Sequence, residues 1–309
     1  MRGNIVFAVL CLLAVIATAL TWAFGDVQRN PLKDESPAMD SNAQDRPLLR
    51  HRLADAGWSL VQTDKRGVDH RVTVPAALLG GAQTETPPWF ALVRAVYPTS
   101  PEVRAQFPSA SPESRGECGG ALYVGGYVVT AAHCVVDRTG AAPLRLEICI
   151  EPRGRSNCRA SYLIHAAVVD LNFEPDGAAG YRDDRAVVML PDDPGGGVEL
   201  PQTPRAEVET GESVHIFAMG SNGDGHLGEF VSRCSQPVVD VRRAIVETRG
   251  EACRIRRADS GSPAGRELPS GVIVPTLIVS SYDPLDERRN FFSPLRPDKI
   301  RAAIMAMED

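Results

Sequence analysis

The sequence predicts an all-β chain made of short antiparallel strands, and two observations carry this prediction. Beyond residue 78, the chain alternates between apolar runs of strand length and turn-forming residues. It also contains 27 glycines and 24 prolines, which favours a turn-rich chain over a helical bundle. Short runs rich in Val, Ile and Leu and bounded by Gly, Pro and Asp are typical of β-barrels and sandwiches. The 309 residues give room for one large domain or two small ones.

The apolar runs can be followed in order along the chain. They are WFALVRAV (89–96), GGALYVGGYVVTAAHCVV (119–136), LRLEICI (144–150), YLIHAAVVDL (162–171), RAVVML (185–190), SVHIFAMG (213–220), AIVETR (244–249) and GVIVPTLIVSSY (271–282). The strongest interior break, LPDDPGGGVELPQTP at 190–204, predicts a link between two halves, about 78–195 and about 196–295. Near the C-terminus, apolar residues at 300, 304 and 307 behind Asp298 predict a short helix at about 297–308.

Two segments precede the predicted strands. In residues 1–25, Arg2 is followed by an apolar run with no charge before Asp26, which is typical of a secretory signal peptide. The run is also long enough to be a retained membrane anchor. Residues 26–77 are polar, charged and proline-bearing, and this composition predicts a flexible linker or a pro-segment. Either way, the folded part is expected outside the cytosol, secreted, periplasmic or anchored by the first segment.

Charge and cysteine usage narrow the function classes. The net charge of −6 gives no indication of nucleic-acid binding, which would favour a basic chain. Six cysteines follow Cys11 in an exported chain, and an even count of this kind predicts disulfides with 15 possible pairings. Their spacing favours nearest-neighbour bridges, which would be Cys118–Cys134, Cys149–Cys158 and Cys234–Cys253. No C-x-x-C pair indicates zinc, and no motif implies a cofactor.

Three short motifs carry chemistry only when they are taken together. They are VVTAAHCVV with His133, RDDRAVVML with Asp184 and ADSGSP with Ser260. A serine hydroxyl becomes a nucleophile near neutral pH when a base such as histidine takes its proton. The histidine in turn needs a buried carboxylate that fixes its tautomer and stabilises the imidazolium. The glycine-flanked loop at Ser260 can also turn backbone N–H groups toward a developing oxyanion.

These motifs resemble those of the chymotrypsin/trypsin family of serine endopeptidases. TAAHC at 130–134 is similar to the family's histidine motif, and CGGALY at 118–123 to the strand before it. DRAVV at 184–188 resembles the family's Asp-x-Ala-apolar-apolar motif, which selects Asp184 over Asp183. The resemblance covers about residues 78–309. It implies two six-stranded antiparallel β-barrels, a His133–Asp184–Ser260 triad, a bridge Cys118–Cys134 beside the histidine, and protein or peptide substrates.

The sequence departs from the family pattern at two places. Ala258 stands where the family has the glycine whose N–H joins that of Ser260 as an oxyanion donor, and alanine is strained wherever the loop needs a positive φ. Arg254 stands where trypsin-like enzymes carry an acidic specificity residue, beside Arg256 and Arg257. If these arginines face the pocket, they favour an acidic substrate residue; the alternative is a solvated basic loop. The strand TLIVSSY places Ser280, Ser281 and Tyr282 at the substrate cleft, where Tyr282 would narrow the pocket.

The start of the domain resembles the family's mature N-terminus. LLGG at 78–81 followed by PPWFALV at 87–93 implies that cleavage frees the amino group of Leu78, which would pair with Asp259 and order the oxyanion loop. Tryptic activation would need a basic residue at position 77, where this chain has Ala77. Cleavage there by another activating peptidase, or no zymogen mechanism, are the alternatives.

The sequence therefore predicts an exported serine endopeptidase that acts through an acyl-enzyme. The alternative is a catalytically weak or inactive homologue that binds partners through the same cleft. An α/β esterase does not fit, because such enzymes run in the order Ser, Asp, His and carry G-x-S-x-G.

Overall fold

The fold was examined in a computed structural model, which describes residues 46–63, 82–137, 140–154, 157–174, 183–201, 208–219, 231–242, 245–251, 254–255, 258–283, 285–286 and 288–308. All of these residues belong to the compact unit Leu32–Asp309. The predicted signal or anchor segment, 1–25, lies outside the described residues. No helix in the described ranges is long and apolar enough to cross a membrane.

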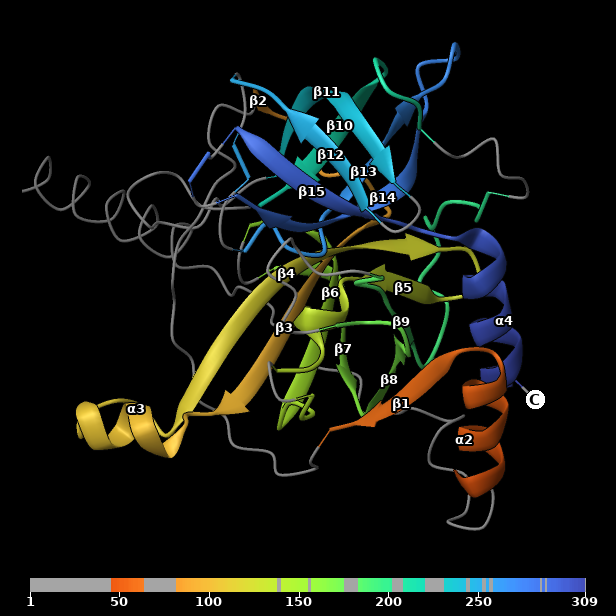
Figure 1. Cartoon of the computed structure of the whole chain (residues 1–309). Coiled ribbons are helices and arrows are strands. Elements are labelled where there is room, and N and C mark those ends of the chain that lie inside the picture. Colours follow the sequence, from red (N-terminus) through yellow and green to blue (C-terminus); the bar gives the residue numbers. More distant parts are fainter. Residues whose placement is uncertain are drawn as a thin grey trace, which may run out of the picture. The chain divides into compact units, whose positions relative to one another are not determined.

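Strands dominate the described part of the chain (Figure 1). Those before residue 195 are β1 Trp58–Gln62, β2 Ala82–Gln83, β3 Phe90–Pro98, β4 Glu113–Tyr123, β5 Tyr127–Thr130, β6 Arg145–Pro152, β7 Cys158–Ile164, β8 Ala166–Asp170 and β9 Ala186–Met189. The later ones are β10 Ser213–Ala218, β11 Ser232–Arg242, β12 Ile245–Arg249, β13 Pro263–Glu267, β14 Ile273–Tyr282 and β15 Arg289–Pro294. The helices are α2 Arg46–Asp55, α3 Pro101–Gln106 and α4 Pro297–Glu308, with a 3₁₀ turn, η1, at Ala132–Cys134.

The first sheet closes into a barrel through one bent strand. Its strand order is β1-β8-β9-β5-β4-β3-β6-β7, with all pairs antiparallel. Because only His165 separates β7 from β8, the segment 158–170 runs on as a strand that pairs with β6 at one end and β9 at the other. With that segment counted once, the barrel has six strands, and β1 pairs with β8 outside this ring. Every residue of β5 and of β8 is buried, as the Val-rich sequences of these strands predict.

The second sheet also closes. Its order is β10-β13-β14-β15-β12-β11-β2, and β10 pairs with β11 to complete a six-stranded ring. The predicted fold, two six-stranded antiparallel barrels with a short C-terminal helix, is confirmed. The short strand β2 pairs with β11 of this sheet, although its residues lie within 78–195, the range predicted for the first barrel.

An N-terminal strap, defined here as residues 46–62, joins the first barrel, and the sequence analysis did not anticipate it. Within the range predicted to be a linker or pro-segment, α2 packs beside α4, and β1 pairs with β8 over five residue pairs (Figure 1). Leu53 and Trp58 are fully buried in the same hydrophobic cluster as the first barrel and as Ile300 of α4. Part of the predicted linker is therefore a structural element of the folded unit.

Candidate active site

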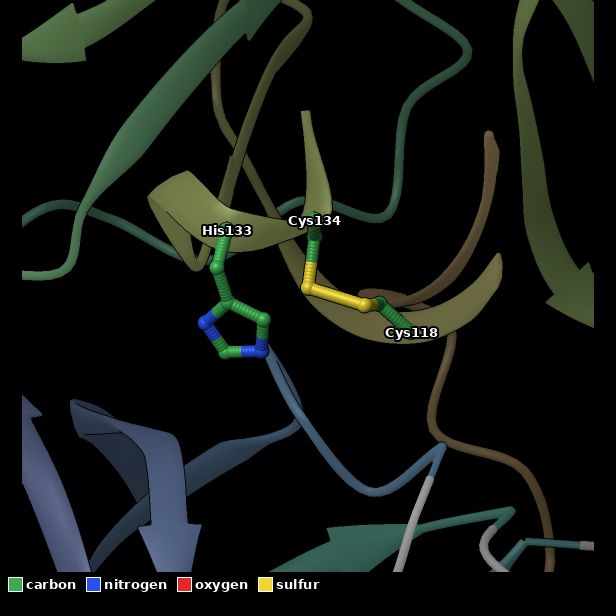
Figure 2. A group of neighbouring side chains, drawn as sticks. All are labelled: Cys118, His133 and Cys134. Carbon is green, nitrogen blue, oxygen red and sulfur yellow. A yellow bond between two sulfur atoms is a disulfide. The ribbon is translucent and has the colours of Figure 1, made fainter. Parts of the chain in front are cut away.

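His133 lies in the short turn that follows β5. The turn η1 is held on one side by the disulfide between Cys134 and Cys118 of β4, and Figure 2 shows the imidazole beside this bridge. The hydroxyl of Tyr97 donates to the carbonyl oxygen of Cys134 at 3.3 Å. Burial raises the pKa of Tyr97 above its ordinary value, so this hydroxyl remains a donor at neutral pH. The backbone that presents His133 is thus fixed from two directions.

Asp184 is fully buried and faces His133. Its Oδ2 lies 2.7 Å from His133 Nδ1, and its Oδ1 accepts a hydrogen bond from the His133 backbone N–H at 3.1 Å. The hydroxyl of Ser280 donates to the same Oδ2 at 2.6 Å. A carboxylate bound in this way holds the imidazole in one orientation with Nδ1 protonated, which makes Nε2 the nitrogen that can act as a base.

Backbone hydrogen bonds tie the loop of Ser260 to β4, which is bridged to the turn of His133, and to β14, which carries Ser280. The carbonyl oxygen of Ser260 accepts from the N–H of Gly119 at 2.8 Å, and Gly119 is next to the bridged Cys118. On the other side, the N–H of Gly261 donates to Val279 at 2.8 Å, directly before Ser280. Ser260 itself is partly exposed. The loop is therefore anchored to both neighbouring elements while its serine remains reachable by solvent.

Glycine is required where this loop approaches β4. A Cβ on Gly119 would lie 2.3 Å from the Ser262 Oγ and 2.6 Å from its Cα. Gly261 has a φ of +73°, and a Cβ there would lie 2.3 Å from Thr130 Oγ1. Both contacts are shorter than real side chains show, so the packing of the serine loop against the histidine strand depends on these two glycines.

Ala258 adopts the left-handed conformation that the sequence analysis identified as its difficulty. Its φ is +72°, a region that costs an L-residue about 1–2 kcal/mol. An alanine in place of glycine keeps its backbone N–H, so the donor predicted for the oxyanion is still present, at a conformational cost. The following residue, Asp259, is fully buried.

Comparisons with known proteins agree with this arrangement. The family model described as Trypsin matches residues 98–273, more than half of the chain. The chain belongs to the trypsin family. Among solved structures, that of HL collagenase matches with a TM-score of 0.55 at 15% identity, over 75% of this chain and 99% of the collagenase chain. At that identity the likeness shows the fold alone. A comparison with curated proteins gave no match. Family and fold together support a serine protease.

The structure places the remaining predicted residues of this trypsin-family site as follows. Ser280, predicted at the substrate cleft, is buried with its hydroxyl on Asp184, so its side chain serves the aspartate. Ser281 and Tyr282 continue β14 and are partly exposed. Arg254 is partly buried and precedes the buried Ile255. Leu78, Ala77, Arg256 and Arg257 lie outside the described residues.

The disulfides follow the predicted nearest-neighbour pairing where they can be seen. Cys118–Cys134 and Cys149–Cys158 are both bridged, which confirms these two pairs. Cys234 is also disulfide-bonded, while its predicted partner, Cys253, lies outside the described residues. Cys118, Cys134 and His133 bring their potential ligand atoms within 4.8 Å of one another. Because the two sulfur atoms are bonded to each other, they offer no thiolate to a metal ion in this state.

The sequence analysis missed the role of the Ser280 side chain. The signal was a pair of hydroxyl residues, Ser280 and Ser281, at the end of an otherwise apolar strand. A buried hydroxyl needs a hydrogen-bond partner, and Asp184 supplies it from the turn before β9, 96 positions earlier. That pairing follows from the fold and is not visible in the local pattern.

Proposed function

We propose that this trypsin-family chain is an exported serine endopeptidase that cleaves peptide bonds through an acyl-enzyme. Ser260 is the nucleophile, His133 the general base and acid, and Asp184 the residue that orients the histidine. The N–H groups of Ala258 and Ser260 bind the oxyanion. Protein or peptide substrates lie along Ser281 and Tyr282, with Arg254 near the specificity pocket.

Each residue has one task in the reaction. His133 Nε2 takes the proton of the Ser260 hydroxyl as Oγ attacks the substrate carbonyl carbon, and the carbonyl oxygen becomes an oxyanion held by the two N–H donors. His133 then gives that proton to the leaving amine, and the C–N bond breaks to leave an ester on Ser260. Water, deprotonated by His133, hydrolyses the ester and restores the serine. Asp184 keeps its negative charge throughout and stabilises the imidazolium.

The observation that carries this proposal is the hydrogen-bonded cluster of Asp184, His133 and Ser280. A fully buried carboxylate that accepts three hydrogen bonds, two of them from one histidine, is arranged to hold an imidazolium. The anchoring of the Ser260 loop to Gly119 and Val279 supports the role of the serine.

Active-site labelling with a fluorophosphonate probe tests the proposal. We expect the folded, N-terminally sequenced protein to be labelled, the S260A variant to lose labelling, and the D184N variant to react far more slowly. The matched control is S262A, which removes a buried hydroxyl from the same loop and should retain labelling. If the folded wild-type protein is not labelled, or if S260A is labelled equally, the peptidase assignment is wrong.

The second candidate is a weak or inactive homologue that binds peptides through the same cleft. The positive φ at Ala258 favours it, because strain in the oxyanion loop lowers the population of the productive conformation. Folded protein that resists labelling yet binds peptides from a library would support this reading. The same library, digested by active enzyme, would show whether Arg254 selects acidic residues.

Export and activation are further parts of the proposal. The two described disulfides support an oxidising compartment, which agrees with a signal peptide or anchor in residues 1–25. Cleavage before Leu78 by an activating peptidase would supply the amino group for Asp259, whose complete burial suits a charge that is paired within the protein. N-terminal sequencing of fully active protein tests this step, and a start at Asp26 would refute it.

A further inference from the structure

A buried arginine follows the predicted catalytic aspartate directly in the sequence. The side chain of Arg185 is 1% exposed, although guanidinium groups are almost never fully buried unless they are paired. Its Nε donates to Asp170 Oδ2 at 3.2 Å, and one terminal nitrogen donates to the carbonyl oxygen of Pro294 at 2.8 Å. The other terminal nitrogen binds both Asp170 and Asp183. The arginine thus connects β8, the turn before β9 and the end of β15.

The contact with Asp183 closes a tight turn around Asp184. The N–H of Arg185 donates to the carbonyl oxygen of Asp183 at 2.8 Å, so the backbone reverses within three residues. Asp183 has a φ of +49°, a conformation that residues other than glycine rarely adopt without local support. The ion pair between its carboxylate and the Arg185 side chain supplies such support.

The N-terminal strap and α4 complete the network from outside. Lys299 of α4 binds Asp170 through the carboxylate oxygen that Arg185 does not use, and its ammonium lies 5.8 Å from the Trp58 ring centroid. Trp58 of β1 donates from its indole to the carbonyl oxygen of Lys299 at 3.0 Å. The charged groups around the guanidinium are therefore Asp170 on β8, Asp183 in the turn and, beyond Asp170, Lys299 on α4.

We propose that Arg185 is a positioning residue for the triad: its fork fixes the Asp183–Asp184 turn so that the Asp184 carboxylate meets both donors of His133. This inference rests on the proposed function for its kinetic readout. The carboxylate must hold the backbone N–H and Nδ1 of His133 at the same time, so a small rotation of the turn breaks one of the two hydrogen bonds. A misplacement of about 1 Å in such a site can cost about 100-fold in rate.

The test distinguishes the planar, multiply donating shape of the Arg185 guanidinium from its positive charge. R185K retains the positive charge but cannot reach Asp170, Asp183 and the Pro294 carbonyl at once. D183N removes the charge from the turn contact and so weakens its hold on the guanidinium. Asparagine tolerates the left-handed conformation, so this variant should fold even if R185K does not. For both variants we expect kcat to fall about 10- to 100-fold with little change in KM, because the loss is in alignment. The downfield NMR resonance of the His133 Nδ1–H, which reports its hydrogen bond to Asp184, should move upfield or disappear.

The matched control is K299Q, which removes the other cation from Asp170 without touching the turn. A purely structural network predicts that K299Q and the two test variants lower the melting temperature with kcat and the Nδ1–H resonance intact. This NMR resonance is observed without turnover, so it still decides the question if the protein proves to be inactive. If R185K and D183N both retain the wild-type resonance of the His133 Nδ1–H, Arg185 does not position the site. A lower kcat and an altered His133 Nδ1–H resonance in R185K and D183N, with neither change in K299Q, support the proposal.

Discussion

The conformation of Ala258 gives a quantitative prediction for the A258G variant. At a φ of +72°, alanine costs about 1–2 kcal/mol relative to an unstrained residue, and glycine adopts this conformation freely. Glycine also loses more backbone freedom on ordering, which offsets about 0.5–1 kcal/mol of this gain. The net gain for the ordered loop is therefore at most about 1.5 kcal/mol, a factor of about 12 in population. We expect A258G to raise the second-order rate of fluorophosphonate labelling by up to that factor.

Labelling rate is the right assay because it reports the reactivity of Ser260 without knowledge of the preferred substrate. The control is the reverse change at a remote turn, G271A. Gly271 has a φ of +79°, and among the described atoms an added Cβ would meet only Glu267 Oε1, at 3.9 Å. G271A should lower the free energy of unfolding by about 1 kcal/mol and leave labelling unchanged. If G271A shows this cost while A258G labels no faster than wild type, strain at Ala258 does not limit the site.

Three further predictions concern stability. The C118S/C134S variant loses a bridge with a sequence separation of 16, so urea denaturation should show a loss of about 3 kcal/mol, with slower labelling beside His133. W58A removes a fully buried indole from the N-terminal strap and should lower the free energy of unfolding by about 3–5 kcal/mol. A loss of unfolding free energy smaller than that of a substitution at an exposed site would show that the strap is not docked. Burial and the nearby Arg233 charge lower the pKa of His215, so the unfolded chain takes up its proton first as pH falls. Stability should therefore drop below pH 6.5, the ordinary histidine pKa, and H215N should flatten that slope in denaturation series.

The strands could be predicted because their signals are local. Val-rich runs bounded by turn residues predicted β5, β8 and β14, and the packed ring of each barrel follows from their burial. The strained Ala258 could also be identified in advance, since it replaces a glycine within a short motif. What these features share is that one stretch of sequence carries the whole signal.

The strap and the arginine network could not be predicted in this way. Helix α2 offers few apolar residues, and its Leu53 becomes buried only because α4, far along the chain, lies beside it. The ion pair of Lys299 with Asp170 spans 129 positions, and nothing in RDDRAVVML distinguishes a buried arginine from a surface one. The composition of residues 26–77 is polar when the whole range is taken together, although residues 46–62 within it dock on the first barrel.

The docked strap changes what cleavage of the predicted pro-segment would do. A cut between residues 63 and 82 would break one peptide bond but none of the contacts that β1 makes with β8 or Trp58 with Lys299. The strap covers the edge of β8, whose unpaired backbone groups would otherwise face solvent. Five residue pairs between β1 and β8 and the buried indole of Trp58 therefore oppose release of the strap.

Activation and positioning would then lie in different barrels of the same protein. The new amino group at Leu78 would act on Asp259 in the loop before β13 of the second barrel. The strap packs on the first barrel, through the pairing of β1 with β8 and the burial of Leu53 and Trp58 in its hydrophobic cluster. A chain cleaved before Leu78 should therefore keep its strap bound and co-purify as two pieces. Activity that survives full removal of the strap would show that the first barrel holds Asp184 in place without it.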